Sequence, residues 1–135
     1  MAYTLDVEKR KNYLYITVKG ENSRATVMDY LAEVHQLRDQ YNSPDVLVVE
    51  NLSGPGLPTF TIYDIVSKLS EKVPEVIGKI AYVDINPDHD KSKMKFAETA
   101  ALNRGVFVQV FHSIQAAEDW LEQQAKPEGK DGGQP

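Results

Sequence analysis

Apolar residues alternate with polar ones near the start of the chain and then recur in longer blocks. The runs 3–8 and 13–19 flank a polar turn at 9–12, and every other residue of the second run is apolar. Such alternation is typical of a strand with one buried face. Apolar residues at helical spacing from Val27 to Tyr41 then predict an amphipathic helix that Ser23 can cap. The chain is therefore predicted to open with a β-hairpin and a helix.

Three further strands are predicted by apolar runs without polar alternation. The runs 46–49, 79–83 and 106–111 are rich in β-branched or aromatic residues, as expected for strands covered by helices on both faces. Helical patterns occupy 62–73 and 92–103, and a last helix follows Ser113. The loop 51–60 holds two glycines and two prolines, so we expect it to stay irregular until a capping-box-like helix start at Thr61.

The predicted element order is β, β, α, β, α, β, α, β, α. Each strand after the hairpin follows a helix and can pair in parallel through a right-handed crossover. This order predicts an α/β fold with a mixed, mostly parallel five-stranded sheet and helices on both faces. Residues 1–125 are predicted to form this single domain. Residues 126–135 are rich in glycine, proline and charge, which predicts a disordered tail.

Composition narrows the classes of partner and compartment. The 135 residues include no cysteine, which excludes disulfides and thiolate metal sites and fits a reducing compartment. The net charge is −5 and basic residues are spread along the chain, which argues against a nucleic-acid partner. No apolar run approaches the length of about 18 residues that a membrane span needs. We therefore expect a cytoplasmic protein with at most peripheral membrane contact.

Two local patterns carry a resemblance to a known family. These are the strand at 79–84 and the closing run Val110-Phe111-His112-Ser113 that leads to Ala117, Trp120 and Leu121. They resemble the STAS domains, in particular the SpoIIAA-like group related to bacterial anti-sigma-factor antagonists. By element order the likeness extends from about Tyr3 to Leu121. The resemblance implies a small bacterial binding domain without enzyme activity, whose partner is a protein or, as in lipid-carrier relatives, an apolar molecule.

The resemblance also implies a candidate phosphorylation switch. In the sigma-factor antagonists a serine in an Asp-Ser-Ser/Thr-Gly motif is phosphorylated to switch partner binding. The matching stretch here reads Asn51-Leu52-Ser53-Gly54 and lacks the aspartate. The candidate phosphoacceptors are Ser53, Thr59 and Thr61. Ser53 equally fits a turn serine in a Gly/Pro loop, and Thr61 fits a helix N-cap.

A ligand or partner surface is expected beyond the carboxyl ends of the strands, where open α/β sheets bind ligands. From the loops after the third and fourth strands we expect contributions from Asn51, Gly54, Leu57, Phe60, Tyr63 and Asp84. The apolar members suit a lid over a small ligand or a buried interface. Phe60 also fits a hydrophobic staple placed just before a cap at Thr61.

Acidic residues and a histidine cluster after the fourth strand, at Asp84, Asp88, His89 and Asp90. Hard cations bind clustered carboxylates, but the spacing matches no EF-hand loop, and a solvated loop leading into a helix is the simpler interpretation. The three histidines lie in separate predicted elements, and no glycine motif for nucleotide phosphates is present. We expect no enzyme activity, no cofactor and no metal, with an enzyme that uses Asp84 and a metal as a weaker alternative.

Two function hypotheses follow. In the first, the chain is a regulatory interaction module that binds a protein partner and is switched by phosphate on Ser53 or a neighbouring threonine. In the second, it carries or senses a small apolar, lipid-like molecule. Either could act as a monomer or as a dimer.

Overall fold

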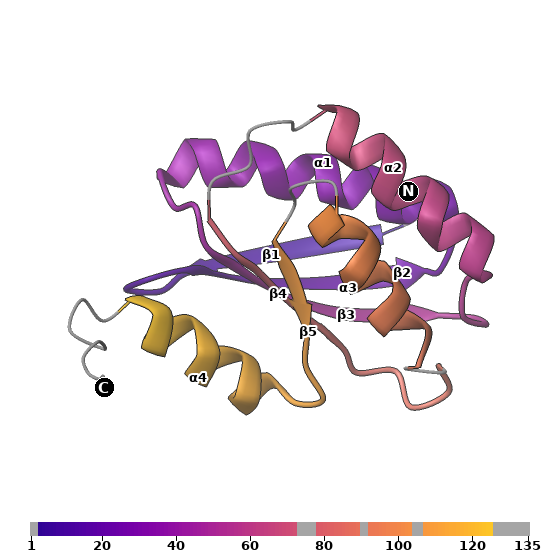
Figure 1. Cartoon of the computed structure of the whole chain (residues 1–135). Coiled ribbons are helices and arrows are strands. Elements are labelled where there is room, and N and C mark those ends of the chain that lie inside the picture. The colour runs from indigo at the N-terminus through magenta and orange to yellow at the C-terminus, as the bar shows by residue number, and fades with distance from the viewer. Residues whose placement is uncertain (1–2, 73–77, 90–91, 104–106, 126–135) are drawn as a thin grey trace.

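The structure is a five-stranded sheet with helices packed on both faces (Figure 1). The computed structural model describes residues 3–72, 78–89, 92–103 and 107–125. The elements follow in the order β1 (Tyr3–Lys9), β2 (Leu14–Glu21), α1 (Arg24–Tyr41), β3 (Val46–Ser53), α2 (Thr59–Lys72), β4 (Ile80–Asp84), α3 (Lys93–Asn103), β5 (Val108–Val110) and α4 (Ile114–Ala125). This is the predicted order.

The strands lie in the sheet in the order in which they occur in the chain. β1 pairs antiparallel with β2, and the pairings β2–β3, β3–β4 and β4–β5 are all parallel. A helix connects each parallel pair, as a parallel connection requires. The predicted mixed, mostly parallel α/β sheet is confirmed.

The two faces of the sheet are covered unequally. α1, α2 and α3 lie on one face and α4 lies alone on the other, as the ribbon shows. Side chains alternate along a strand, so Val46 and Val48 pack toward the three helices, while Leu47 and Val49 pack toward Ala117 of α4. This double coverage explains why β3 has no polar alternation over its first four residues.

Local signals explain the ends of α1. The hydroxyl of Ser23 accepts a hydrogen bond from the Thr26 amide at 3.1 Å, which confirms Ser23 as the N-cap. The helix ends at Asn42, which adopts a left-handed conformation with φ of 52°. Asparagine tolerates that conformation better than most residues, so Asn42 itself explains why α1 ends there.

Several predicted boundaries are corrected. β3 continues to Ser53, which pairs in the parallel ladder with Glu21, so the irregular loop shrinks to 54–58. α2 begins at Thr59, directly after Pro58, and the Ile62 amide donates to the Pro58 carbonyl at 3.1 Å. Thr61 is therefore inside the helix and is not its N-cap.

The bounds of β4 and β5 also differ from the predicted ones, and some predicted segments lie outside the described residues. β4 spans Ile80–Asp84 in place of 79–83, and β5 is described over Val108–Val110 in place of 106–111. Residue 106, residue 73 at the end of the second helical pattern, and the predicted tail 126–135 all lie outside the described residues.

Gly78 should be intolerant of a side chain. Its φ is 107°, and a Cβ there would lie 2.6 Å from the backbone oxygen of Pro44. Gly78→Ala should therefore lower the free energy of unfolding by about 2 kcal/mol, the scale of a strained backbone position. Gly56→Ala is the matched control, because its Cβ would meet nothing within 4 Å. Urea denaturation of both variants checks this, and equal midpoints would contradict it.

Candidate functional site

A carboxylate is buried in the carboxyl-terminal half of β3. Glu50 directly follows the apolar run of β3, and only 4% of its surface is exposed. Its two oxygens accept hydrogen bonds from the hydroxyls of Tyr30 in α1 and Tyr82 in β4. Val48 and Ile80 pack toward α1, α2 and α3, and Glu50 and Tyr82 lie two residues after them on β3 and β4. Because side chains alternate along a strand, Glu50 and Tyr82 face the same helices.

Burial shifts the pKa values of Glu50, Tyr30 and Tyr82. Loss of solvation raises the pKa of Glu50, and the two phenol hydrogen bonds oppose that rise only in part. Burial, together with the nearby charge of Glu50, raises the pKa of Tyr30 and of Tyr82 well above its ordinary value. Both phenols therefore keep their protons and act as donors toward the carboxylate.

Asp84 and His89 form a second buried pair beside Glu50. Asp84 is the register partner of Glu50 across the β3–β4 ladder. His89 Nδ1 lies 2.7 Å from Asp84 Oδ2, and the two side chains are 5% and 7% exposed. His89 Nε2 lies 2.8 Å from the carbonyl oxygen of Gly54. Asn86 Nδ2 also lies 3.3 Å from Nε2, but each ring nitrogen has an oxygen acceptor at a shorter distance, so the geometry suits an imidazolium that donates in both directions.

Hydrogen bonds of Asn86 stabilise the loop that contains His89. Its side-chain Nδ2 donates to the Leu52 carbonyl at 2.7 Å, and its side-chain Oδ1 accepts from the Asp88 backbone amide at 2.9 Å. The Asn86 backbone amide in turn donates to Asp84 Oδ1 at 3.0 Å. The interpretation of 84–90 as a solvated loop is therefore wrong for Asn86 and His89, because both side chains are buried and make hydrogen bonds within the protein. Asp90 lies outside the described residues.

An apolar cavity of about 310 Å³ adjoins these polar groups. It lies between the sheet and the three helices that cover this face, and its apolar wall includes Val48, Ile80 and Val108 from strands and Leu31, Ile65 and Ala101 from helices. Tyr30, Glu50, Tyr82, Asp84 and His89 also line it. Along β3 and β4 the lining changes from apolar to polar toward the carboxyl end, so the chamber has one apolar and one polar end.

The mouth of the chamber lies between two loops. Pro55, Gly56 and Asp88 line the cavity and are also exposed, so the wall reaches the surface between 54–58 and 85–89. Leu57 lines the chamber as well and packs against the core. The opening thus lies beyond the carboxyl ends of β3 and β4, where ligands of open α/β sheets bind.

The predicted surface residues divide into two groups. Asp84, Gly54 and Leu57 contribute to the chamber or its polar end. Gly54 adopts φ of 96°, a conformation that favours glycine, and its carbonyl meets His89. Asn51 is an exposed residue of β3 and does not line the chamber.

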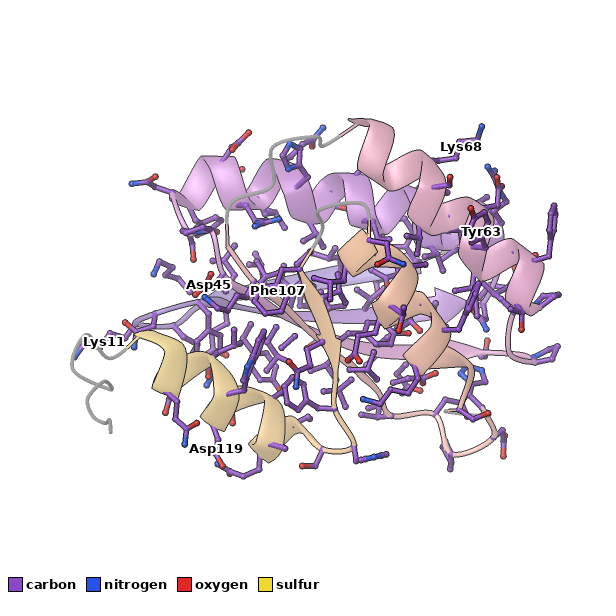
Figure 2. All side chains as sticks on the ribbon, in the orientation of Figure 1. Lys11, Asp45, Tyr63, Lys68, Phe107 and Asp119 are labelled. Carbon is purple, nitrogen blue, oxygen red and sulfur yellow. The ribbon has the colours of Figure 1, made fainter. Side chains whose placement is uncertain are left out.

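The aromatic candidates lie outside the chamber. Phe60 is 79% exposed in the first turn of α2, so its interpretation as a hydrophobic staple is wrong. Tyr63 is also exposed and lies on α2 (Figure 2). Its ring centroid lies 6.0 Å from that of Phe96 in α3. The two helices thus present an aromatic pair to solvent.

The candidate phosphoacceptors differ in accessibility. Ser53 is exposed at the end of β3, and its hydroxyl donates to the Gly20 carbonyl at 3.1 Å. Thr59 is exposed as the first residue of α2, whereas Thr61 is half-buried within the helix. Ser53 and Thr59 are therefore the accessible hydroxyl groups of the three.

Sequence patterns alone did not single out Tyr30, Glu50 or Tyr82, and they named His89 only as part of the acidic cluster after the fourth strand. A signal for Glu50 was present, since a glutamate that continues a fully buried apolar run needs partners inside the protein. Tyr30 and Tyr82 come from segments far apart in the chain, so their convergence on Glu50 depends on the packing of α1 over the sheet. His89 was assigned to a solvated loop because its neighbours are acidic.

Within the described part of the chain, no group of three or more histidine, aspartate or glutamate side chains is placed to hold a metal ion. None of the described helices has both the length and the apolar character to cross a membrane.

Replacing Glu50 should change how stability depends on pH. The pKa of Glu50 is raised in the folded protein, so its contribution to stability is fully present below the pKa of the unfolded chain and is lost as pH rises through the folded pKa. The charged or titratable groups around it are Tyr30, Tyr82, Asp84 and His89. Glu50→Gln should therefore gain stability relative to the parent chain as pH rises from acidic to neutral.

Urea denaturation of both proteins at a series of pH values measures this difference. Asp119→Asn is the control, because Asp119 is exposed on α4 (Figure 2) and α4 covers the face of the sheet opposite the chamber. A stability difference between Glu50→Gln and the parent chain that does not vary with pH would contradict the raised pKa.

Comparisons with known proteins add no family to this description. The chain matches no family model, and a search among curated proteins found no significant match. What is established is the α/β fold with its mostly parallel sheet and a two-ended chamber on the face covered by three helices.

Proposed function

We propose that this protein binds a small apolar molecule in the chamber between the sheet and α1, α2 and α3, as a carrier or sensor. The observation that carries the proposal is the chamber itself. Its volume of about 310 Å³ falls within the range of small-molecule sites, about 300 to 1,000 Å³, and its wall is mostly apolar with a few convergent polar groups.

Packing energetics support an occupant. Protein interiors are close-packed, so an apolar space of this size within the fold is an exception. Water that enters through the mouth meets a mostly apolar wall, and an apolar ligand would release that water. On the other face of the sheet, α4 packs directly onto Leu47 and Val49. A ligand would supply on the three-helix face the contacts that α4 supplies on the other.

The same proposal places the chain with the SpoIIAA-like STAS domains of the bacterial cytoplasm and assigns it a binding role without catalysis. The closing sequence pattern and the predicted α/β element order support that kinship. A binding role is supported by the pairing within the site, where Glu50 is held by two phenols and Asp84 by His89. Such mutual pairing suits groups that orient a ligand.

Filling the chamber should weaken binding. Ala101 on α3 lines the chamber and is buried, so Ala101→Leu should occupy part of its volume and reduce affinity for a neutral apolar probe, N-phenyl-1-naphthylamine, by at least tenfold. Ala101→Val should have a smaller effect. Probe fluorescence gives the affinity, and the thermal midpoint reports whether each variant is folded.

The matched control is Ala116→Leu, because Ala116 is exposed on α4 on the opposite face. Probe binding that is equal in all the folded variants, or absent from the parent chain, would refute the chamber as a ligand site. Native mass spectrometry of the purified parent chain provides an independent measurement of a retained molecule.

A second candidate function is a regulatory interaction module switched by phosphate. Two observations favour it. Tyr63, Phe60 and Phe96 are exposed near the starts of α2 and α3, and Ser53 and Thr59 are exposed hydroxyl groups on the loop side of α2. Phosphate on Thr59 would lie at a helix N-terminus, where added negative charge is stabilised.

This second candidate predicts phosphate within residues 51–61 of the protein isolated from its native host, with Ser53 or Thr59 as the acceptor. Phosphopeptide mapping by mass spectrometry measures it. An unmodified segment at high sequence coverage would argue against a phosphate switch and leave the ligand chamber unaffected.

A further inference from the structure

The polar end of the chamber restricts the head group of its ligand. We propose that the ligand is an amphiphile with a cationic head, a primary amine that sits against Glu50, and an apolar body that fills the chamber. The inference rests on the proposed ligand-binding function and adds the chemical class of the ligand.

The charges around the chamber favour a cation. Among its described lining residues are the three carboxyl groups of Glu50, Asp84 and Asp88 and the imidazole of His89, with no lysine or arginine. His89 lies 2.7 Å from Asp84 and offsets that carboxylate. Among the described lining residues, Glu50 and Asp88 have no such cationic partner, so carboxyl groups outnumber cationic groups there.

Glu50 is built to accept further hydrogen bonds. Each of its oxygens receives one phenol hydrogen bond, from Tyr30 or Tyr82, whereas a carboxylate offers about four acceptor positions. An ammonium group supplies three donors and no acceptor, and hydrogen bonds between ionised partners are the stronger kind. Loss of solvation raises the pKa of Glu50, and an ammonium group beside it would favour the ionised carboxylate and so lower that pKa again.

Other head groups fit less well. A carboxylate or phosphate would lie against the charge of Glu50 inside a poorly solvated site, where like charges repel more strongly than in water. A hydroxyl can donate one hydrogen bond to Glu50 but leaves its charge unbalanced. The expected order of affinity is therefore amine, then alcohol, then carboxylate for the same apolar body.

Octylamine, octanol and octanoate test this order, because they share one apolar body and differ in the head group. Displacement of N-phenyl-1-naphthylamine from the full chain gives each affinity at neutral pH. Octylamine should bind at least tenfold more tightly than octanol, and octanoate should bind most weakly. Glu50→Gln should reduce the preference for the amine over the alcohol by about tenfold, whereas the control Asp119→Asn should leave it unchanged.

A second measurement uses the parent chain alone and so avoids any effect of the substitution on folding. Binding of octylamine should weaken as pH falls through the raised pKa of Glu50, while octanol binding should change much less. The groups that surround Glu50 are Tyr30, Tyr82, Asp84 and His89, of which the two phenols stay protonated across this range. A parallel pH dependence for both ligands would overturn the proposal.

The outcomes separate this inference from the proposed function. If the three octyl compounds bind equally, or octanoate binds best, the cationic head is wrong and the apolar chamber stands. If the amine preference survives in folded Glu50→Gln, the assignment to Glu50 is wrong. If neither the octyl compounds nor the naphthylamine probe binds, the proposed function fails together with the inference.

Discussion

The burial of Glu50 is the interaction on which the site depends. A carboxylate inside a protein requires donors, and here one comes from α1 and one from β4. The contact joins α1 to the neighbouring parallel strands β3 and β4. The same contact places polar atoms at one end of an otherwise apolar chamber, so the requirement for partners also shapes the chamber.

β3 packs against α4 on one face of the sheet and lines the chamber on the other. On the α4 side, Leu47 and Val49 pack with Ala81 and Ala117 in a cluster of buried residues. On the other side, small residues of α3 such as Ala97 and Ala101 leave space above Val48. Leu57 and its loop cover part of that space near the mouth. Both faces of β3 carry apolar residues, and the chamber lies on the face that α1, α2 and α3 cover.

The polar groups around the chamber form two linked layers. Glu50 with its tyrosines lies within the fold, and Asp84 with His89 ties the loop after β4 to the Gly54 carbonyl. Asn86 connects the same loop to the end of β3 through the Leu52 carbonyl. Hydrogen bonds thus connect the two loops at the mouth, which supports a chamber with a defined opening.

The sequence alone determined the order of elements, the α/β class and the Ser23 cap, because these depend on local periodicity and short-range hydrogen bonding. It also located the relevant edge of the sheet, through Asp84, Gly54 and Leu57. It misplaced the start of α2, because the Thr61 capping pattern competes with a helix that begins just after Pro58. Only the tertiary structure brought Tyr30 and Tyr82 to Glu50 and buried His89 against Asp84. Those contacts join residues far apart in the chain or within a loop, so they depend on how α1 and the loops pack over the sheet, which periodicity does not encode.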